Sequence, residues 1–239
     1  MDKYIIAIGG GSLAEKTTAK IDKYIADLAK KRAAERRPIG VFIGSASHDS
    51  MPYFNTFRKT YTADYNLKAD CVLSVYGEMN AEKIKSKFEK ADLIYIGGGD
   101  TLFMLDLWKK KAIYELVLDA YNRGVIVAGL SAGAICWFDK MYTDSQFLNG
   151  DKNYNYSIHD GMGVLRGTCC PHYEERINDF DYALNSLTHF PAWGIEGNCA
   201  VVFKNGKYLT TISAGGNAYQ ISVDNEITEK KLLESKIIF

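Results

Sequence analysis

Residues 125–133, VIVAGLSAG, are the stretch that decides the fold. Four consecutive apolar residues at 125–128 are typical of a buried strand, and they lead directly into a G-x-S-x-G turn centred on Ser131. The following residues 134–141, AICWFDKM, are compatible with a helix. Strand, tight turn and helix in this order are typical of a nucleophile elbow, which holds a strained serine at the carboxyl end of a sheet. We therefore predict that Ser131 is a nucleophile; the alternative is an incidental serine in a glycine-rich turn.

Short apolar runs of this kind alternate with helical patterns along the first 133 residues. Strands are expected at 4–8, 39–45, 71–75, 91–99 and 123–133, and helices at 14–35, 52–66, 80–90, 101–109 and 112–122. Continuous apolar strands separated by amphipathic helices indicate a parallel sheet that is covered on both faces. Because crossovers between parallel strands are right-handed, the pattern predicts a doubly wound, mostly parallel α/β sheet.

The last third of the chain has a different texture. Strands are expected at 199–203, 207–212 and 217–223, between Asn-Gly, Gly-Gly and Asp-Asn turns. We predict that they join the sheet edge as antiparallel strands, so that residues 1–239 form one α/β domain. The polar, Tyr- and Asn-rich residues 149–161 are predicted to be a long loop that covers the site as a lid.

The composition limits the partners and the compartment. Lys and Arg together number 29, as do Asp and Glu, so the charge balance predicts neither a nucleic-acid nor a membrane partner. No apolar run approaches the roughly 18 residues of a membrane span, and the N-terminus has no basic segment of a secretory signal. The five cysteines show no C-x-x-C spacing, so neither a zinc site nor a disulfide framework is predicted. These features predict a cytoplasmic protein, monomeric or homodimeric.

Two glycine clusters end other strands. The cluster at 97–99 ends the strand before the elbow, and the carboxyl ends of parallel strands line the ligand crevice of such sheets. A glycine N–H of this cluster and the N–H of Ala132 at the helix start are therefore candidate donors to an oxyanion; the alternative is a turn followed by a helix cap at Asp100 or Thr101. The cluster at 9–11 is not G-x-G-x-x-G, because position 14 is alanine, and is read as a turn.

A serine nucleophile needs a general base, and histidine has a suitable pKa. His48 and His159 lie in polar segments, and His189 ends a helical segment before a proline. His172 follows the short apolar run TCCP and precedes a helix rich in acids, which predicts a position at the carboxyl end of a strand. The topology therefore favours His172 as the base.

Three acids are candidates to orient that histidine, and their positions in the sequence do not rank them. Glu196 lies between glycines in the segment GIEGN, between two strand-like runs. Glu174 follows His172 by two positions, and Asp144 follows the elbow helix. A surface turn or a helix cap is the alternative role for Asp144.

Four stretches resemble the peptidase E (aspartyl dipeptidase) family of serine peptidases, which includes the cyanophycinases. They are IYIGGGDT (94–101), GLSAGA (129–134), DGMGVLRGTCCPHYEE (160–175) and GIEGN (194–198). The first ninety residues match only in their strand–helix pattern. The resemblance implies a flavodoxin-like or class I glutamine-amidotransferase-like sheet that carries a Ser-His-acid triad, with no metal or organic cofactor.

The resemblance also implies roles for individual residues. It makes Ser131 the nucleophile, His172 the base and Glu196 the favoured acid, with Asp144 as the alternative. Gly99 and Ala132 become the oxyanion donors.

Glu174 is a departure from peptidase E. His172-Tyr173-Glu174 is similar to the His-x-Glu pair of class I glutamine amidotransferases, whose nucleophile is a cysteine. The serine at position 131 disfavours glutaminase chemistry here.

The resemblance implies short peptides as substrates, including dipeptides with an N-terminal Asp, and an aspartate substrate calls for a nearby cation. Arg166 and Arg176 flank His172 in the sequence and are the candidates; a solvated surface arginine is the alternative for each. The rival hypotheses are an amidase or esterase with the same triad, and a non-catalytic module that binds a nucleotide or another small ligand on the same fold.

Overall fold

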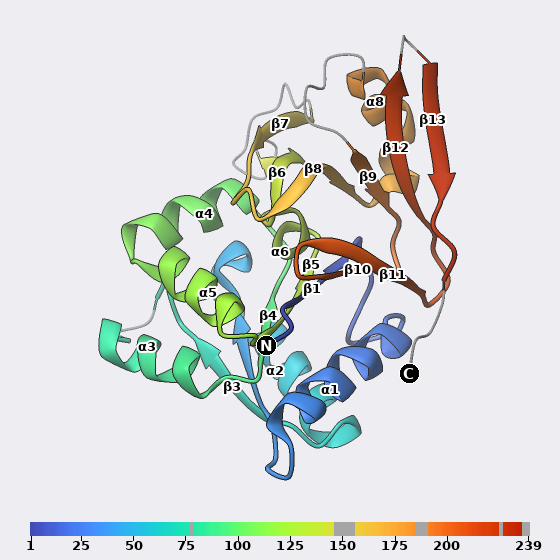
Figure 1. Cartoon of the computed structure of the whole chain (residues 1–239). Coiled ribbons are helices and arrows are strands. Elements are labelled where there is room, and N and C mark those ends of the chain that lie inside the picture. The colour runs from blue at the N-terminus through green and yellow to red at the C-terminus, as the bar shows by residue number, and fades with distance from the viewer. Residues whose placement is uncertain (77–78, 146–155, 185–190, 225–226, 236–239) are drawn as a thin grey trace.

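The computed structural model of the chain describes residues 1–76, 79–145, 156–184, 191–224 and 227–235. Its strands form two sheets, and the first has seven strands in the order β11-β10-β1-β5-β4-β2-β3 (Figure 1). The five strands β1, β5, β4, β2 and β3 run parallel to one another, whereas β10 and β11 are antiparallel to their neighbours. The bounds are β1 (Tyr4–Ile8), β2 (Ile39–Ile43), β3 (Lys68–Val72), β4 (Leu93–Ile96), β5 (Ile126–Leu130), β10 (Cys199–Lys204) and β11 (Lys207–Ser213). The predicted doubly wound α/β class is confirmed.

Helices cover both faces of this sheet. Alternate residues of each strand point to opposite faces, and both sets are apolar, so both faces are buried. In β1, Ile6 and Ile8 face α1 (Ala19–Ala33) and α2 (Met51–Lys59), whereas Ile5 and Ala7 face the core that contains the other helices. Those helices are α3 (Ala81–Lys90), α4 (Thr101–Lys110) and α5 (Ile113–Asn122). A single π-helical turn, η2 (Thr60–Asp64), extends α2, and a 3-10 turn, η1 (Ser45–Ser47), follows β2.

The second sheet was not predicted. Its six strands have the order β13-β12-β9-β8-β6-β7. The three inner strands β6, β8 and β9 are parallel, and the outer strands are antiparallel to their neighbours. The bounds are β6 (Phe138–Thr143), β7 (Ser157–Asp160), β8 (Leu165–Pro171), β9 (Ala192–Ile195), β12 (Ala218–Asp224) and β13 (Ile227–Leu232). Side chains of β6, β8 and β9 belong to the same buried cluster as those of β5 and β10, and α8 (Tyr173–Leu184) packs on the other face.

Three sequence expectations are corrected by this second sheet. The helix expected at 134–141 is the four-residue α6 (Ala132–Ile135) followed by strand β6. The strand expected at 217–223 pairs with β9 and not with the edge of the first sheet. Of the expected loop at 149–161, residues 157–160 form β7, and residues 149–155 lie outside the described residues.

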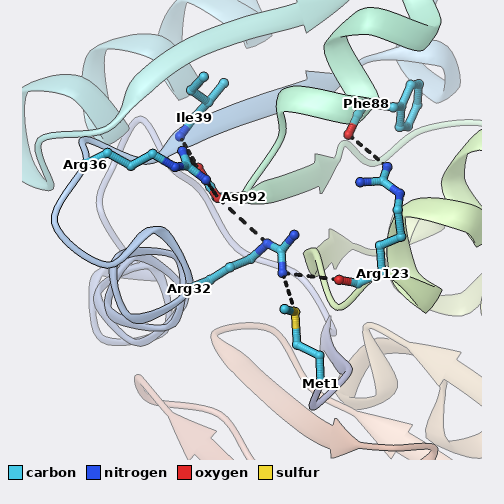
Figure 2. A network of polar contacts seen from close by, with 7 residues as sticks. All are labelled: Met1, Arg32, Arg36, Ile39, Phe88, Asp92 and Arg123. Carbon is cyan, nitrogen blue, oxygen red and sulfur yellow. Dashed lines mark hydrogen bonds and ion pairs between the residues drawn. The ribbon is translucent and has the colours of Figure 1, made fainter.

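The amino ends of the parallel strands are held by one buried acid, Asp92 (Figure 2). Its carboxylate is inaccessible to solvent and accepts two hydrogen bonds from Arg36 and one from the Ile39 N–H at 2.9 Å. Arg32 Nε lies 3.7 Å from the same carboxylate, and the Arg32 guanidinium also donates to the Arg123 carbonyl at 3.2 Å. Since Asp92 precedes β4 and its backbone pairs with the starts of β2 and β5, this network joins three strands.

The described helices give no evidence of a membrane span, because none of them is both long enough and apolar enough to cross a bilayer.

Candidate active site

Ser131 lies at the carboxyl end of β5 in a strained conformation, with φ 51° and ψ −107°. Its N–H donates to the Ile8 carbonyl at 2.9 Å, which ties the turn to β1. The flanking glycines are required by close backbone packing. A Cβ on Gly129 would lie 1.9 Å from the Gly133 oxygen, and one on Gly133 would lie 2.3 Å from the Ile96 oxygen. The geometry therefore explains G-x-S-x-G by sterics, and it leaves the serine hydroxyl at the sheet edge.

His172 follows β8 and also has a left-handed backbone, with φ 48°. Its N–H donates to the Gly9 carbonyl at 3.0 Å, so the turn after β1 holds the histidine from the first sheet. Its Nε2 lies 3.0 Å from Ser131 Oγ. The structure thus brings the predicted nucleophile and the predicted base into hydrogen-bond distance across two sheets.

Gly10 is a site residue that the sequence reasoning missed. A Cβ at this position would lie 2.6 Å from both Nδ1 and Cε1 of His172, so the imidazole ring rests directly on the glycine backbone. The sequence predicts a turn at 9–11, and no local signal indicates that the ring of a distant histidine packs on one of these glycines.

The environment of His172 favours its neutral form. Burial lowers the pKa of the imidazole, and the positive charge of Arg176 lowers it further; Glu175, Glu174 and Asp144 act in the opposite direction. A base that stays unprotonated at neutral pH can accept a proton from Ser131.

Two of the three candidate acids, Glu196 and Glu174, accept hydrogen bonds from backbone N–H groups. Glu196 Oε2 accepts from the Asn217 N–H at 2.7 Å and from Asn217 Nδ2 at 3.1 Å. Both oxygens of Glu174 accept from the Gly197 N–H, at 2.9 and 3.0 Å. Within the part of the chain that is described, neither carboxylate accepts a hydrogen bond from His172. Glu174 acts on the ring electrostatically, and Glu196 is not among the charges that shift the pKa of His172.

Asp144 and Arg176 form an ion pair beside the site. Asp144 Oδ2 lies 3.2 Å from a terminal nitrogen of Arg176, whose side chain is only 6% exposed. The guanidinium also lies over the Tyr156 ring, with 4.7 Å between the guanidinium carbon and the ring centroid. Asp144 thus neutralises Arg176, whose charge acts on His172.

Arg166 is not brought to the site. It lies near the start of β8, whereas His172 follows the end of that strand, so the strand rise separates them by roughly 20 Å. Its side chain is exposed, and its carbonyl accepts from Trp193 Nε1 at 3.1 Å.

Of the two predicted oxyanion donors, Ala132 directly follows Ser131, and Gly99 precedes Asp100, the cap of α4. Ala132 is the first residue of α6, so its N–H has no partner within the helix. Gly99 has φ 135°, and a Cβ there would lie 2.1 Å from the Ala46 oxygen, so only glycine fits. The adjacent Gly98 faces the serine, since a Cβ on it would lie 3.5 Å from Ser131 Cβ. Asp100 caps α4 by accepting from the Phe103 N–H at 3.0 Å, so turn and cap coexist.

The other histidines lie elsewhere. His48 is exposed and packs on Phe103, with ring centroids 4.3 Å apart. His159 Nε2 lies 2.9 Å from Ser157 Oγ on β7, and His189 lies outside the described residues. Among the residues that the structure describes, no group of three or more His, Cys, Asp or Glu side chains is arranged to hold a metal ion.

Comparisons with known proteins identify the family of this chain. The model of Peptidase family S51 matches residues 5–211. The uncharacterized peptidase YgaJ of Bacillus subtilis is 33% identical over 238 residues, which cover 95% of this chain and 96% of the relative. The fold and these matches define a serine peptidase.

The chain belongs to peptidase family S51, which confirms the resemblance seen in the sequence. Two solved structures share its fold. A peptidase from an acI-B1 actinobacterium has a TM-score of 0.74 at 15% identity, covering 98% of this chain and 95% of that one. A candidate peptidase E of Listeria monocytogenes EGD-e has a TM-score of 0.63 at 17% identity, covering 89% of this chain and 99% of that one.

Proposed function

We propose that this protein hydrolyses short peptides through a covalent acyl-enzyme on Ser131, with His172 as the general base. The observation that carries the proposal is the 3.0 Å contact between Ser131 Oγ and His172 Nε2 on a strained elbow. A hydroxyl next to a neutral imidazole is an activated nucleophile.

The proposed reaction is acyl transfer. His172 takes the hydroxyl proton while Ser131 Oγ attacks the scissile carbonyl carbon, and the N–H groups of Gly99 and Ala132 bind the resulting oxyanion. The imidazolium then gives its proton to the leaving amine, and the C–N bond breaks. Water, deprotonated by the same base, hydrolyses the ester and releases Ser131.

For the acid we favour Glu174 over Glu196. Glu174 binds the N–H of Gly197, and Gly197 lies against Gly10, on which the His172 ring rests. Its negative charge raises the pKa of His172 and so stabilises the imidazolium that forms during attack. Glu196, which the family resemblance implies, is the alternative acid.

For the substrate we propose short peptides without a requirement for an N-terminal Asp. Such a requirement needs a cation that is free to bind the aspartate carboxylate, and Arg176 is already paired with Asp144. A panel that compares Asp-Leu, Ala-Leu and Lys-Leu with p-nitrophenyl acetate measures this preference and separates a peptidase from an esterase.

A location in the cytoplasm stays a prediction.

The test of the function is the Ser131→Ala variant. We expect loss of dipeptide hydrolysis by about 10⁴-fold or more, and loss of covalent labelling by a fluorophosphonate probe, at unchanged thermal stability. Ser86→Ala, which removes the same hydroxyl from α3, is the matched control and should keep full activity. Unchanged turnover in Ser131→Ala would exclude Ser131 as the nucleophile.

A further inference from the structure

A cavity lies away from Ser131, between the outer side of α1 and the strands β10 and β11. Its volume is about 440 Å³, which is within the range of small-molecule sites. Its wall includes Leu28 of α1 with Leu209 and Ile212 of β11. Leu28 and Leu209 are only partly buried, so the cavity offers an apolar wall that the core does not cover completely.

The rim of this cavity is basic. Four lysines and one aspartate line it, so its formal charge is +3 on a chain whose net charge is zero. Lys23 is paired with Asp27 at 2.6 Å, and Lys204 with Asp2 at 2.7 Å. Among the described residues, Lys20 and Lys31 make no ion pair with a carboxylate. An anion bound here would therefore meet lysines whose charge is not already neutralised.

Tyrosines and lysines supply hydrogen-bond donors to the lining of the cavity. Lys204 Nζ lies 5.6 Å from the centroid of the Tyr4 ring, and Tyr4 and Lys204 are paired residues of neighbouring strands. Tyr24 lies on α1 one turn after Lys20, and both residues line the cavity. Phenol and ammonium donors next to an apolar wall suit a carboxylate that carries a hydrocarbon chain.

We propose that this cavity binds a medium-chain carboxylate, with the carboxylate at Lys20 and Tyr24, which lie one turn apart on α1, and the alkyl chain along Leu28, Leu209 and Ile212. The lysine stems add apolar surface while their ammonium groups stay in water. This site is independent of the peptidase activity, because its residues lie on α1, β1, β10 and β11, outside the site around Ser131.

The test is calorimetric titration of the whole protein with decanoate, below the concentration at which decanoate forms micelles. We expect saturable binding of one molecule, with decanol and decyltrimethylammonium binding at least tenfold more weakly. Equal binding of decanol would overturn the role of the charge, and binding of acetate as tight as that of decanoate would show a site for small anions without a chain.

Two pairs of variants locate the site. Leu209→Glu should weaken decanoate binding at least tenfold, whereas Leu232→Glu, the same change at an exposed leucine of β13, should leave it unchanged. Lys20→Glu should weaken binding severalfold, and Lys109→Glu on α4 should not. Unchanged affinity in Leu209→Glu, with the protein folded by circular dichroism, would refute the proposal, as would an absence of binding to the wild-type protein.

Discussion

The two ends of the parallel strands are built on opposite principles. At the carboxyl ends, Ser131 and His172 both have left-handed backbones, each of which costs about 1–3 kcal/mol. At the amino ends, Asp92 is buried with its carboxylate bound by Arg36, Arg32 and the Ile39 N–H (Figure 2). One end carries backbone strain at the two proposed catalytic residues, and the other carries paired charges that join β2, β4 and β5. Substitutions at the two ends should therefore affect different properties.

The largest effect is expected from Asp92→Asn. Removal of the charge leaves Arg32 and Arg36 without their buried partner, and breaking a buried pair costs about 3 kcal/mol of unfolding free energy. Urea denaturation measures this loss, and the activity per folded molecule should not change. Asp119→Asn, which breaks the exposed pair with Arg123, is the control and should cost less than about 1 kcal/mol. Equal losses in the two variants would contradict a special role for the amino end.

At the carboxyl end, Gly10→Ala should lower the activity and leave the stability almost unchanged. The new methyl group occupies the space of the His172 ring, so the imidazole has to move away from Ser131. A displacement of about 1 Å can lower a rate about 100-fold, and we expect that loss in kcat with KM little changed. Stability should stay close to that of the wild type. Gly40→Ala in β2 adds the same group away from the site and should keep its activity. A fully active Gly10→Ala variant would show that the glycine does not position the base.

Asp22 is a second buried acid, and it differs from Asp92 because its carboxylate accepts hydrogen bonds from hydroxyl groups and not from arginines. It accepts from Thr18 Oγ1 at 2.7 Å and from the Tyr61 hydroxyl at 2.9 Å, and burial raises its pKa to about 6. Because its folded pKa is raised, its stabilising contribution is complete below the ordinary value of 3.8 and is lost as pH rises through about 6.

Asp22→Asn should therefore remove on the order of 2 kcal/mol of this decline in unfolding free energy between pH 4 and pH 7. Urea denaturation at several pH values, compared with Asp27→Asn on the exposed side of α1, measures it. Parallel pH profiles for the wild type and Asp22→Asn would contradict the raised pKa.

The smallest effect concerns the pH dependence of catalysis. Burial and Arg176 lower the pKa of His172, so the acidic limb of kcat/KM should lie below pH 6.5. Glu174→Gln removes a charge that raises this pKa, and the limb should move to lower pH by a fraction of a unit. Glu196→Gln should leave it in place. The opposite pattern, with the limb moved only in Glu196→Gln, would make Glu196 the acid.

Local patterns predicted the parallel strands and the elbow, because apolar runs and tight glycine turns leave a signature within a few residues. The runs at 168–171 and 217–223 were also recognisable as strands, but their pairing into a second sheet had no local signature, and the strand β6 was hidden because it directly follows a helix of only four residues. The partners of the acids were equally hidden. Glu174 and Glu196 are bound by the backbone N–H groups of Gly197 and Asn217, and any residue except proline carries such a group.

The seat of His172 on Gly9 and Gly10 also sets the order in which the site can form during synthesis. A ribosome makes the glycines first, then Ser131, and His172 only after β6 and β8, while β10 closes β1 later still. A growing chain therefore carries the serine long before an imidazole can reach it. Under the proposed mechanism, peptide hydrolysis therefore requires that the two sheets have joined.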